Sequence, residues 1–357
     1  PLRLVGSEMC IRDRIKIACL SKRHSKQNMN KQIQWGIMGT GRIANAFAEG
    51  LQNTTNGELQ AIGSRNQESA QNFAKQWNIP TVCNSYEDLA SSTSVDAIYI
   101  ATPHTEHAKN AILCMTQGKA VLCEKPFAVN SEQVRSMIEK SREHNVLLME
   151  GMWSRSPPLM RKIRNIIKNN EMGEIRTVHA DFGFKPENND PKGRLLNPEL
   201  AGGSLLDVGI YPISLAFMIN GKPDSIVSEW TRGKTGVDEQ ASIIFKYANG
   251  SMAVLHSSIQ SDTGQEAFIS GTKGTIRIHK QCWKPQIMTL TDSKTGESKK
   301  VESPFIGNGF NYEAEHFGQL LIEGRKESPI MPLEESISII STLDDIRKIW
   351  GLRYPFE

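Results

Sequence analysis

The chain has 357 residues, of which 38% are hydrophobic and 23% charged, and its formal net charge at pH 7 is +3. These values fit a soluble protein of about two domains and lack the charge excess expected of a nucleic-acid or anionic-membrane partner. No uninterrupted apolar run is long enough to span a bilayer. The six cysteines form no C-x-x-C pair and no metal-ligand spacing, which is typical of reduced, mostly buried thiols in a cytoplasmic protein.

The first residues stand apart from the rest of the chain. Residues 1–28 are basic, show no strand or helix pattern, and lack the apolar core of a secretory signal. We expect them to be a disordered or non-native extension, with the natural chain beginning at Met29. The alternative is a genuine organelle-targeting extension.

The first expected strand and helix flank a glycine-rich turn. Apolar residues alternate along residues 33–37 as in a strand, and they recur at helical spacing from residue 43 to residue 51. In the G-x-G-x-x-A sequence between them, Gly39 permits a tight turn and Gly41 lets the backbone approach a pyrophosphate at the helix N-terminus. The alternative is an ordinary strand-to-helix turn that binds nothing. The motif predicts cofactor contacts from Gly39, Thr40, Gly41, Arg42 and Ile43.

The end of the second strand indicates which dinucleotide is bound. An NAD site usually carries Asp or Glu there, to hold the ribose hydroxyls. Here the strand Leu59–Gly63 is followed by Ser64 and Arg65, which can both bond a 2′-phosphate. We therefore expect NADP, with NAD less favoured. The alternative is that Arg65 is a solvated loop charge.

Strand and helix patterns alternate over residues 32–150, which predicts a Rossmann domain with a parallel doubly wound sheet. Two buried strands end in Thr102-Pro103-His104 and Glu124-Lys125-Pro126, and ligands of such sheets bind beyond these strand ends. Lys125 could donate to a substrate oxygen and lower the pKa of a neighbouring acid, or it could be a surface lysine. A polar helix start explains His104 as well as a ligand contact does. The expected cofactor contacts are Ala101, Thr102, Pro103, His104, Glu124 and Lys125.

After Trp153 the pattern changes to a basic amphipathic helix and then to strands with hairpin signals. Asn249-Gly250 is expected to join one pair of strands, and residues 270–274 another. Two helical stretches follow, Tyr312–Glu323 and Glu334–Trp350. We predict an α+β second domain over residues 151–357 with a large, mostly antiparallel open sheet. Its last helices are expected to pack back on the Rossmann domain.

This second domain supplies a second group of candidate catalytic residues. Asp207 and Tyr211 are four residues apart, so a helix would place both on one face. The preceding Gly202-Gly203 pair allows close approach of the backbone. The Tyr211 phenol could exchange a proton with a substrate oxygen if a nearby Lys⁺ lowered its pKa from about 10. The alternative is a buried structural tyrosine and a helix-capping aspartate. The remaining histidines show no metal spacing, so we expect no metal.

Together these motifs resemble one family over residues 33–357. The chain is similar to the Gfo/Idh/MocA (glucose–fructose oxidoreductase/inositol dehydrogenase) family in its GTGRIA turn, its Glu124-Lys125-Pro126 and its G-G-x₃-D-x-G-x-Y segment. Many members carry His where this chain has Tyr211. Tyr, and the segments MEGMWSR, YEAEH and ESPIMPLEES, resemble the branch of trans-dihydrodiol and D-xylose dehydrogenases.

The resemblance implies Lys125 and Tyr211 as the catalytic pair, with Asp207 positioning substrate or pair. It also implies that Trp153 and Arg155 line the nicotinamide side of the cofactor site, and that the open sheet forms a homodimer or homotetramer interface. We predict an NADP-dependent oxidoreductase that exchanges a hydride with a carbinol or carbonyl carbon of a sugar, polyol or vicinal diol. The alternatives are an NAD-dependent glycosidase of the same fold and a non-catalytic dinucleotide-sensing regulator.

Overall fold

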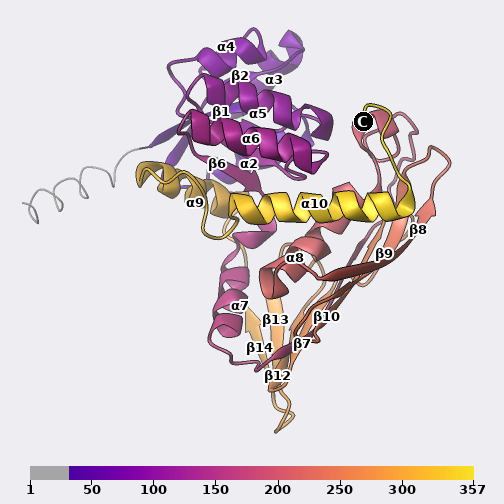
Figure 1. Ribbon diagram of the computed structural model, residues 1–357. Helices are drawn as coiled ribbons and strands as arrows, with labels where there is room; N and C mark the ends of the chain where they lie inside the picture. Colours follow the sequence, from indigo (N-terminus) through magenta and orange to yellow (C-terminus); the bar gives the residue numbers. More distant parts are fainter. Residues whose placement is uncertain (1–31) are drawn as a thin grey trace, which may run out of the picture.

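The computed structural model describes residues 32–357, and the expectations for residues 1–28 and for Met29 lie outside that range. Its first sheet has six parallel strands in the order β3-β2-β1-β4-β5-β6 (Figure 1). The strands are β1 (Ile33–Met38), β2 (Gly57–Gly63), β3 (Thr81–Cys83), β4 (Ala97–Ile100), β5 (Ala120–Glu124) and β6 (Leu148–Gly151). β4, β5 and β6 are buried at every position, because helices cover both faces of a doubly wound sheet. The Rossmann architecture predicted from the sequence is confirmed.

Helices connect these strands, and polar caps fix where several of them begin. They are α2 (Arg42–Leu51), α3 (Gln67–Trp77), α4 (Tyr86–Ser91), α5 (His107–Thr116) and α6 (Ser131–Glu143), with the short 3-10 turns η1 (His104–Glu106) and η2 (Trp153–Arg155). The side chain of Asn130 accepts from the Gln133 backbone N–H at 3.0 Å, so Asn130 is the N-cap of α6. The chain order reverses direction across the sheet between β1 and β4, and the glycine turn lies at this switch point.

The second sheet has eight strands in the order β14-β13-β12-β11-β7-β10-β9-β8. They are β7 (Ile175–Gly183), β8 (Ser225–Arg232), β9 (Asp238–Lys246), β10 (Met252–Ser258), β11 (Ala267–Gly271), β12 (Gly274–Ile278), β13 (Ile287–Asp292) and β14 (Ser298–Glu302). Both predicted hairpins are confirmed, and Gly250 supplies the positive φ (+80°) of the first one. The pairing of β7 with β10 is parallel, so the sheet is mixed although mostly antiparallel.

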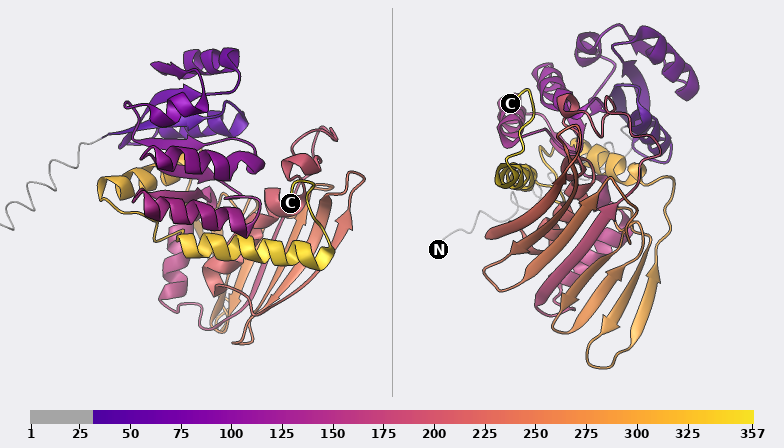
Figure 2. Two further views of the ribbon diagram at one scale, coloured as in Figure 1. Left: turned by 45° about the horizontal axis from the view of Figure 1, so that its top comes forward. Right: turned by 90° about the vertical axis from the view of Figure 1, so that its right-hand side faces the viewer.

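Four more helices bind the two sheets into one body: α7 (Pro158–Lys168), α8 (Ile210–Asn220), α9 (Phe310–Ile322) and α10 (Leu333–Trp350), with the short turns η3 (Pro198–Leu200) and η4 (Leu205–Gly209). α9 packs on α2, while α10 runs between α6 and α8 and reaches β8 (Figure 1 and Figure 2). The C-terminal helices therefore pack back on the Rossmann domain, as expected.

One strongly apolar segment of the second domain lies in the protein core. Within residues 32–357, Pro198–Asn220 is long and apolar enough to cross a membrane, by length and composition only. However, 83% of its most apolar 18-residue stretch is buried inside the protein, against the second sheet and α10. A helix that is apolar on every side is typical of a protein core as well as of a membrane.

The four cysteines in the described part of the chain are buried and form no disulfide: Cys83, Cys114, Cys123 and Cys282.

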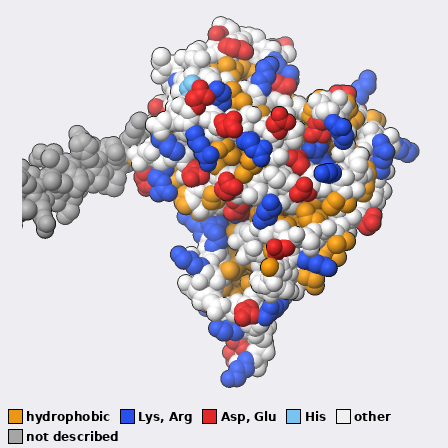
Figure 3. Space-filling view, in the orientation of Figure 1, with side chains coloured by type: hydrophobic (Ala, Val, Ile, Leu, Met, Phe, Trp, Pro, Cys, Tyr) orange, Lys and Arg blue, Asp and Glu red, His pale blue; other side chains and the backbone are white. Residues whose placement is uncertain are grey.

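The face of the molecule drawn in Figure 3 carries interspersed charges of both signs. The open face of the second sheet is different, and the right-hand view of Figure 2 shows its strands without a covering helix. Val227, Ile244 and Val254 are paired in register across β8, β9 and β10, and they are 54%, 36% and 37% exposed. Their neighbours along the strands point to the other face and are buried under the helices. An exposed apolar row of this kind marks an interaction surface.

We propose that a second copy of the chain covers this row in a symmetric dimer. Ile244→Glu would place charges opposite one another in that interface without entering the core, since the side chain faces outward. We expect the variant to run as a folded monomer in light scattering at micromolar concentration, while the wild type runs as a dimer or tetramer. Ser136→Glu, which adds the same charge on exposed α6, should leave the assembly unchanged. A monomeric wild type would contradict the proposal.

Candidate active site

A cavity of about 1050 Å³ opens at the carboxyl ends of the Rossmann strands and extends to the second sheet. It is lined by nearly all of the residues singled out in the sequence: Gly39, Thr40, Gly41, Arg42, Ile43, Ser64, Arg65, Ala101, Thr102, Pro103, His104, Glu124, Lys125, Trp153, Asp207 and Tyr211. These positions come from both domains, so the fold brings the two groups of motifs to one site.

The glycine turn fits the phosphates of a dinucleotide. Gly39 has a φ of +105°, and a Cβ there would lie 2.7 Å from the Ala101 carbonyl oxygen, so a side chain is excluded. A Cβ at Gly41 would meet no protein atom within 4 Å, which leaves the backbone beside α2 open to the cavity. The first N–H groups of α2 have no side-chain cap and can bond an anion.

The part of the cavity next to the end of β2 carries positive charge. Ser64 and Arg65 directly follow β2 and line the cavity, as expected. Tyr86, which the sequence did not indicate, lies beside Arg65 and lines the same wall. Burial raises the pKa of Tyr86 even though Arg65 opposes the shift, so this side chain remains a neutral phenol. Arg65 therefore has a neutral neighbour in Tyr86, and its positive charge is not neutralised by that side chain.

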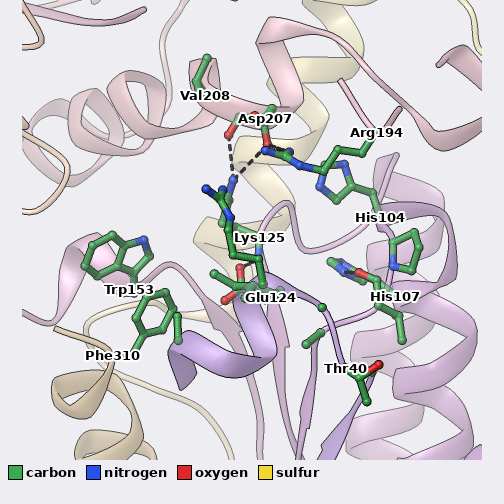
Figure 4. A pocket seen from close by; sticks show the side chains of 18 of the residues that line it. Thr40, His104, His107, Glu124, Lys125, Trp153, Arg194, Asp207, Val208 and Phe310 are labelled. Carbon is green, nitrogen blue, oxygen red and sulfur yellow. Dashed lines mark hydrogen bonds and ion pairs between the residues drawn. The ribbon is translucent and has the colours of Figure 1, made fainter. Parts of the chain in front are cut away.

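Lys125 joins the two domains at the centre of the site (Figure 4). Its Nζ donates to the backbone oxygen of Asp207 at 2.7 Å and lies 3.6 Å from the Asp207 carboxylate. Arg194 contacts the same carboxylate oxygen at 2.5 Å. Burial alone would raise the pKa of Asp207, but Lys125 and Arg194 outweigh it and lower that pKa to about 2. Asp207 is therefore ionised and holds the lysine in place.

Tyr211 lies next to this ion pair, with its ring centroid 4.9 Å from the Lys125 ammonium. Its hydroxyl accepts a hydrogen bond from the Trp153 indole at 3.0 Å. Burial raises the pKa of Tyr211, and Lys125 lowers it by less, so the net direction is upward. The sequence argument included the lysine but not the burial, which is the larger effect. The phenol therefore keeps its proton at neutral pH.

The segment that carries Asp207 and Tyr211 is held from behind by Asp238 at the start of β9. One carboxyl oxygen of Asp238 accepts from the Leu205 N–H at 2.6 Å and from the Ser204 hydroxyl at 2.8 Å. Gly203, with a φ of +126°, passes so close that a Cβ would lie 2.1 Å from the other oxygen. Asp207 then falls in a π-helical turn (η4), and Tyr211 in the first turn of α8. The sequence did not indicate Asp238, which has no motif around it.

The two histidines have different roles. His107 is fully buried, and its two ring nitrogens lie 2.8 and 2.9 Å from the Pro126 and Thr102 carbonyl oxygens, so it packs between two strand-end motifs. His104 lines the cavity beside Arg194 (Figure 4). Burial, with His107 and Lys125 adding to it, lowers the pKa of His104 to about 3, so this ring is neutral.

Arg155 corrects the expectation that it lines the cofactor site. It is 3% exposed and does not line the large cavity, because its guanidinium binds Ser214 at 2.6–2.9 Å and Glu335 at 2.5 Å. It supports the wall behind Trp153. The lining contributed by the second domain includes Arg194 and Phe182, which is stacked on Trp283 with ring centroids 3.5 Å apart. These three side chains come from separate segments with no shared motif, so sequence reasoning missed them.

Comparison of the sequence with known proteins identifies the family of both domains. The family described as "Oxidoreductase family, NAD-binding Rossmann fold" (GFO_IDH_MocA) matches residues 33–152, and the GFO/IDH/MocA C-terminal domain matches residues 160–277. The chain is 38% identical over 334 residues to trans-1,2-dihydrobenzene-1,2-diol dehydrogenase of Xenopus laevis (90% of this chain, 99% of the relative). It is 35% identical over 335 residues to the Homo sapiens enzyme of the same name (90% and 98%).

Solved structures share the fold at lower identity. A 3-ketoreductase from Actinomadura kijaniata in complex with NADP and TDP-benzene has a TM-score of 0.79 at 23% identity, over 89% of this chain and 98% of that chain. Aldose-aldose oxidoreductase from Caulobacter crescentus with glycerol has a TM-score of 0.80 at 24% identity, over 89% and 97%. The chain therefore belongs to the Gfo/Idh/MocA family of NAD(P)-binding oxidoreductases.

Proposed function

We propose that this dehydrogenase acts on CH–OH groups with NADP as cofactor, interconverting the carbinol and carbonyl carbons of a sugar, polyol or vicinal diol. The observation that carries the proposal is the placement of Lys125, Asp207 and Tyr211 in one cavity with the glycine turn. The names of the relatives, dihydrodiol dehydrogenases, and of structural neighbours such as the aldose-aldose oxidoreductase support the substrate class.

Different residues of the cavity bind the cofactor, transfer the proton and stabilise the substrate oxygen. The bound nicotinamide supplies or accepts the hydride. The turn at Gly39–Gly41 and the start of α2 hold the phosphates, and Arg65 with Ser64 bonds the 2′-phosphate. The Tyr211 hydroxyl gives its proton to the carbonyl oxygen in reduction and takes it back in oxidation. The Lys125 ammonium stabilises negative charge on that oxygen, because Asp207 fixes it at the cavity wall.

The first prediction concerns the cofactor. Arg65→Asp should weaken NADP binding by roughly 10- to 100-fold, because each charge-assisted hydrogen bond that is lost is worth about 1.5–3 kcal/mol. Binding of NAD, which lacks the phosphate, should change little or improve. Dissociation constants from fluorescence titration test this, with Lys109→Asp on exposed α5 as the charge-matched control. Equal wild-type efficiency with NAD⁺ and NADP⁺ would contradict the assignment.

The second prediction concerns the proton donor. Tyr211→Phe keeps the ring and removes only the hydroxyl, so kcat should fall by about 10²–10⁴, the usual contribution of general acid–base catalysis, while the cofactor still binds. Tyr247→Phe is the matched control, since Tyr247 is also buried but does not line the cavity. Near-normal turnover of Tyr211→Phe with hydride transfer rate-limiting would exclude Tyr211 as the donor.

The third prediction concerns the lysine. Lys125→Met should lower kcat and shift the pH at which the residual activity titrates upward, because the lysine charge lowers the pKa of Tyr211. With that charge removed, the phenolate is less favoured and forms only at higher pH. Lys125→Arg keeps a positive charge and should keep the wild-type titration point. A pH–rate profile of Lys125→Met that shifts downward, or not at all, would refute this coupling.

A further inference from the structure

Two buried carboxyl groups, those of Glu124 and Glu313, take no part in the steps above. Glu124 ends β5, lines the cavity and is 4% exposed. One of its oxygens accepts from the Tyr99 hydroxyl and the other from the Lys125 backbone N–H at 3.1 Å. Glu313, on α9, has no exposed surface, and neither of its carboxyl oxygens has a hydrogen-bond partner among residues 32–357.

The two carboxyl groups differ in charge at neutral pH. Burial, and then the charge of Glu124, raise the pKa of Glu313 well above its usual range, so it keeps its proton. Burial also raises the pKa of Glu124, to about 7, although the Tyr99 hydroxyl and Lys125 favour the ionised form. Small changes in nearby charge will therefore decide whether Glu124 holds a proton.

The titratable groups around this pair come from five neighbouring elements: Tyr99 on β4, Cys123 and Lys125 on and just after β5, Glu150 on β6, Asp207 on η4 and Tyr211 on α8. The pKa values of Tyr99, Cys123 and Tyr211 are all raised, chiefly by burial, so these groups stay neutral near pH 7. Lys125 stays cationic, since Tyr211 and Asp207 raise its pKa against the effect of burial. Glu150 has a pKa of about 7, raised by burial, but it does not line the cavity. Glu124 is therefore the cavity group in this set whose charge changes near neutral pH.

Glu124 lies at the end of the cavity that remains for the nicotinamide. The glycine turn and Arg65 account for the phosphate and adenosine end, and Lys125 and Glu124 line the other end, beside Trp153 (Figure 4). An oxidised nicotinamide ring carries a positive charge that the reduced ring lacks. At a buried position, salt screens the attraction between this charge and a carboxylate only weakly.

We propose that Glu124, backed by the neutral Glu313, discriminates between the two redox forms of the cofactor by its own charge. The carboxylate favours the oxidised ring, and the protonated acid removes that preference. Binding of NADP⁺ therefore expels a proton from Glu124, whereas binding of NADPH does not. This inference rests on the proposed use of NADP and adds a residue that sets redox preference and its pH dependence.

Calorimetric titration of the full chain in buffers of different ionisation enthalpy measures the protons released on binding. NADP⁺ and NADPH carry the same phosphates, so the difference between them isolates the ring. We expect extra proton release with NADP⁺ near pH 7. The ratio of the NADP⁺ to the NADPH dissociation constant should fall as pH rises through 7, by about tenfold for a pKa change of one unit.

Glu124→Gln should abolish both effects. Glu150→Gln is the matched control and should preserve them, because Glu150 is equally buried with a similar pKa but lies outside the cavity. Tyr99→Phe removes the hydrogen bond to Glu124 and should move the midpoint of the ratio to higher pH, which tests the proposal even if Glu124→Gln fails to fold.

Equal proton release with both redox forms in the wild type would overturn the proposal, as would a difference that persists in folded Glu124→Gln or a midpoint unchanged in Tyr99→Phe. Failure of the wild type to bind either form of NADP is a separate result, which would overturn the proposed cofactor itself.

Discussion

The ion pair between Lys125 and Asp207 is the contact on which the site depends, because each domain contributes one partner. Lys125 follows the last residue of a Rossmann strand, and Asp207 lies in a turn of the second domain. The lysine also bonds the Asp207 backbone oxygen, so both the position of the turn and its charge are fixed. Removing one partner of a buried pair leaves an uncompensated charge and typically costs about 3–5 kcal/mol. The geometry of Tyr211 follows from this contact.

Several buried acids around the site reduce that cost because their pKa values are raised to neutral pH or above. Burial raises the pKa values of Glu124, Glu150 and Asp238 to about 7 and that of Glu313 further. Asp207 is the opposite case, because two cations contact it. Among these five groups Asp207 is firmly ionised, whereas the other four carboxyl groups titrate near or above neutral pH. Such groups can respond to a ligand charge, which an ordinary surface carboxylate cannot do.

The helices of the C-terminal part keep the two sheets in a fixed relation. α9 packs on α2 behind the glycine turn, and α10 joins α6 to α8, the helix that begins with Tyr211. Arg155 belongs to this framework through its bonds to Ser214 on α8 and Glu335 on α10. The resemblance of its segment to the family implied a cofactor contact for Arg155. Instead, the bonds to Ser214 and Glu335 orient its side chain away from the large cavity.

The sequence by itself determined both domain types, the glycine turn and the strand-end motifs, because these depend on local patterns and short spacings. The pairing of Lys125 with Tyr211 and Asp207 was implied by the family resemblance, since no short spacing links Lys125 to the other two. The sequence could not place Arg194, Phe182, Trp283, Asp238 or Glu313, which reach the site from separate elements without a motif. Nor could it give the direction of the Tyr211 pKa, since the lysine charge can be inferred from sequence but the extent of burial cannot. Burial and cross-domain contact arise only when distant segments pack together, and these two factors decided the charges in the site.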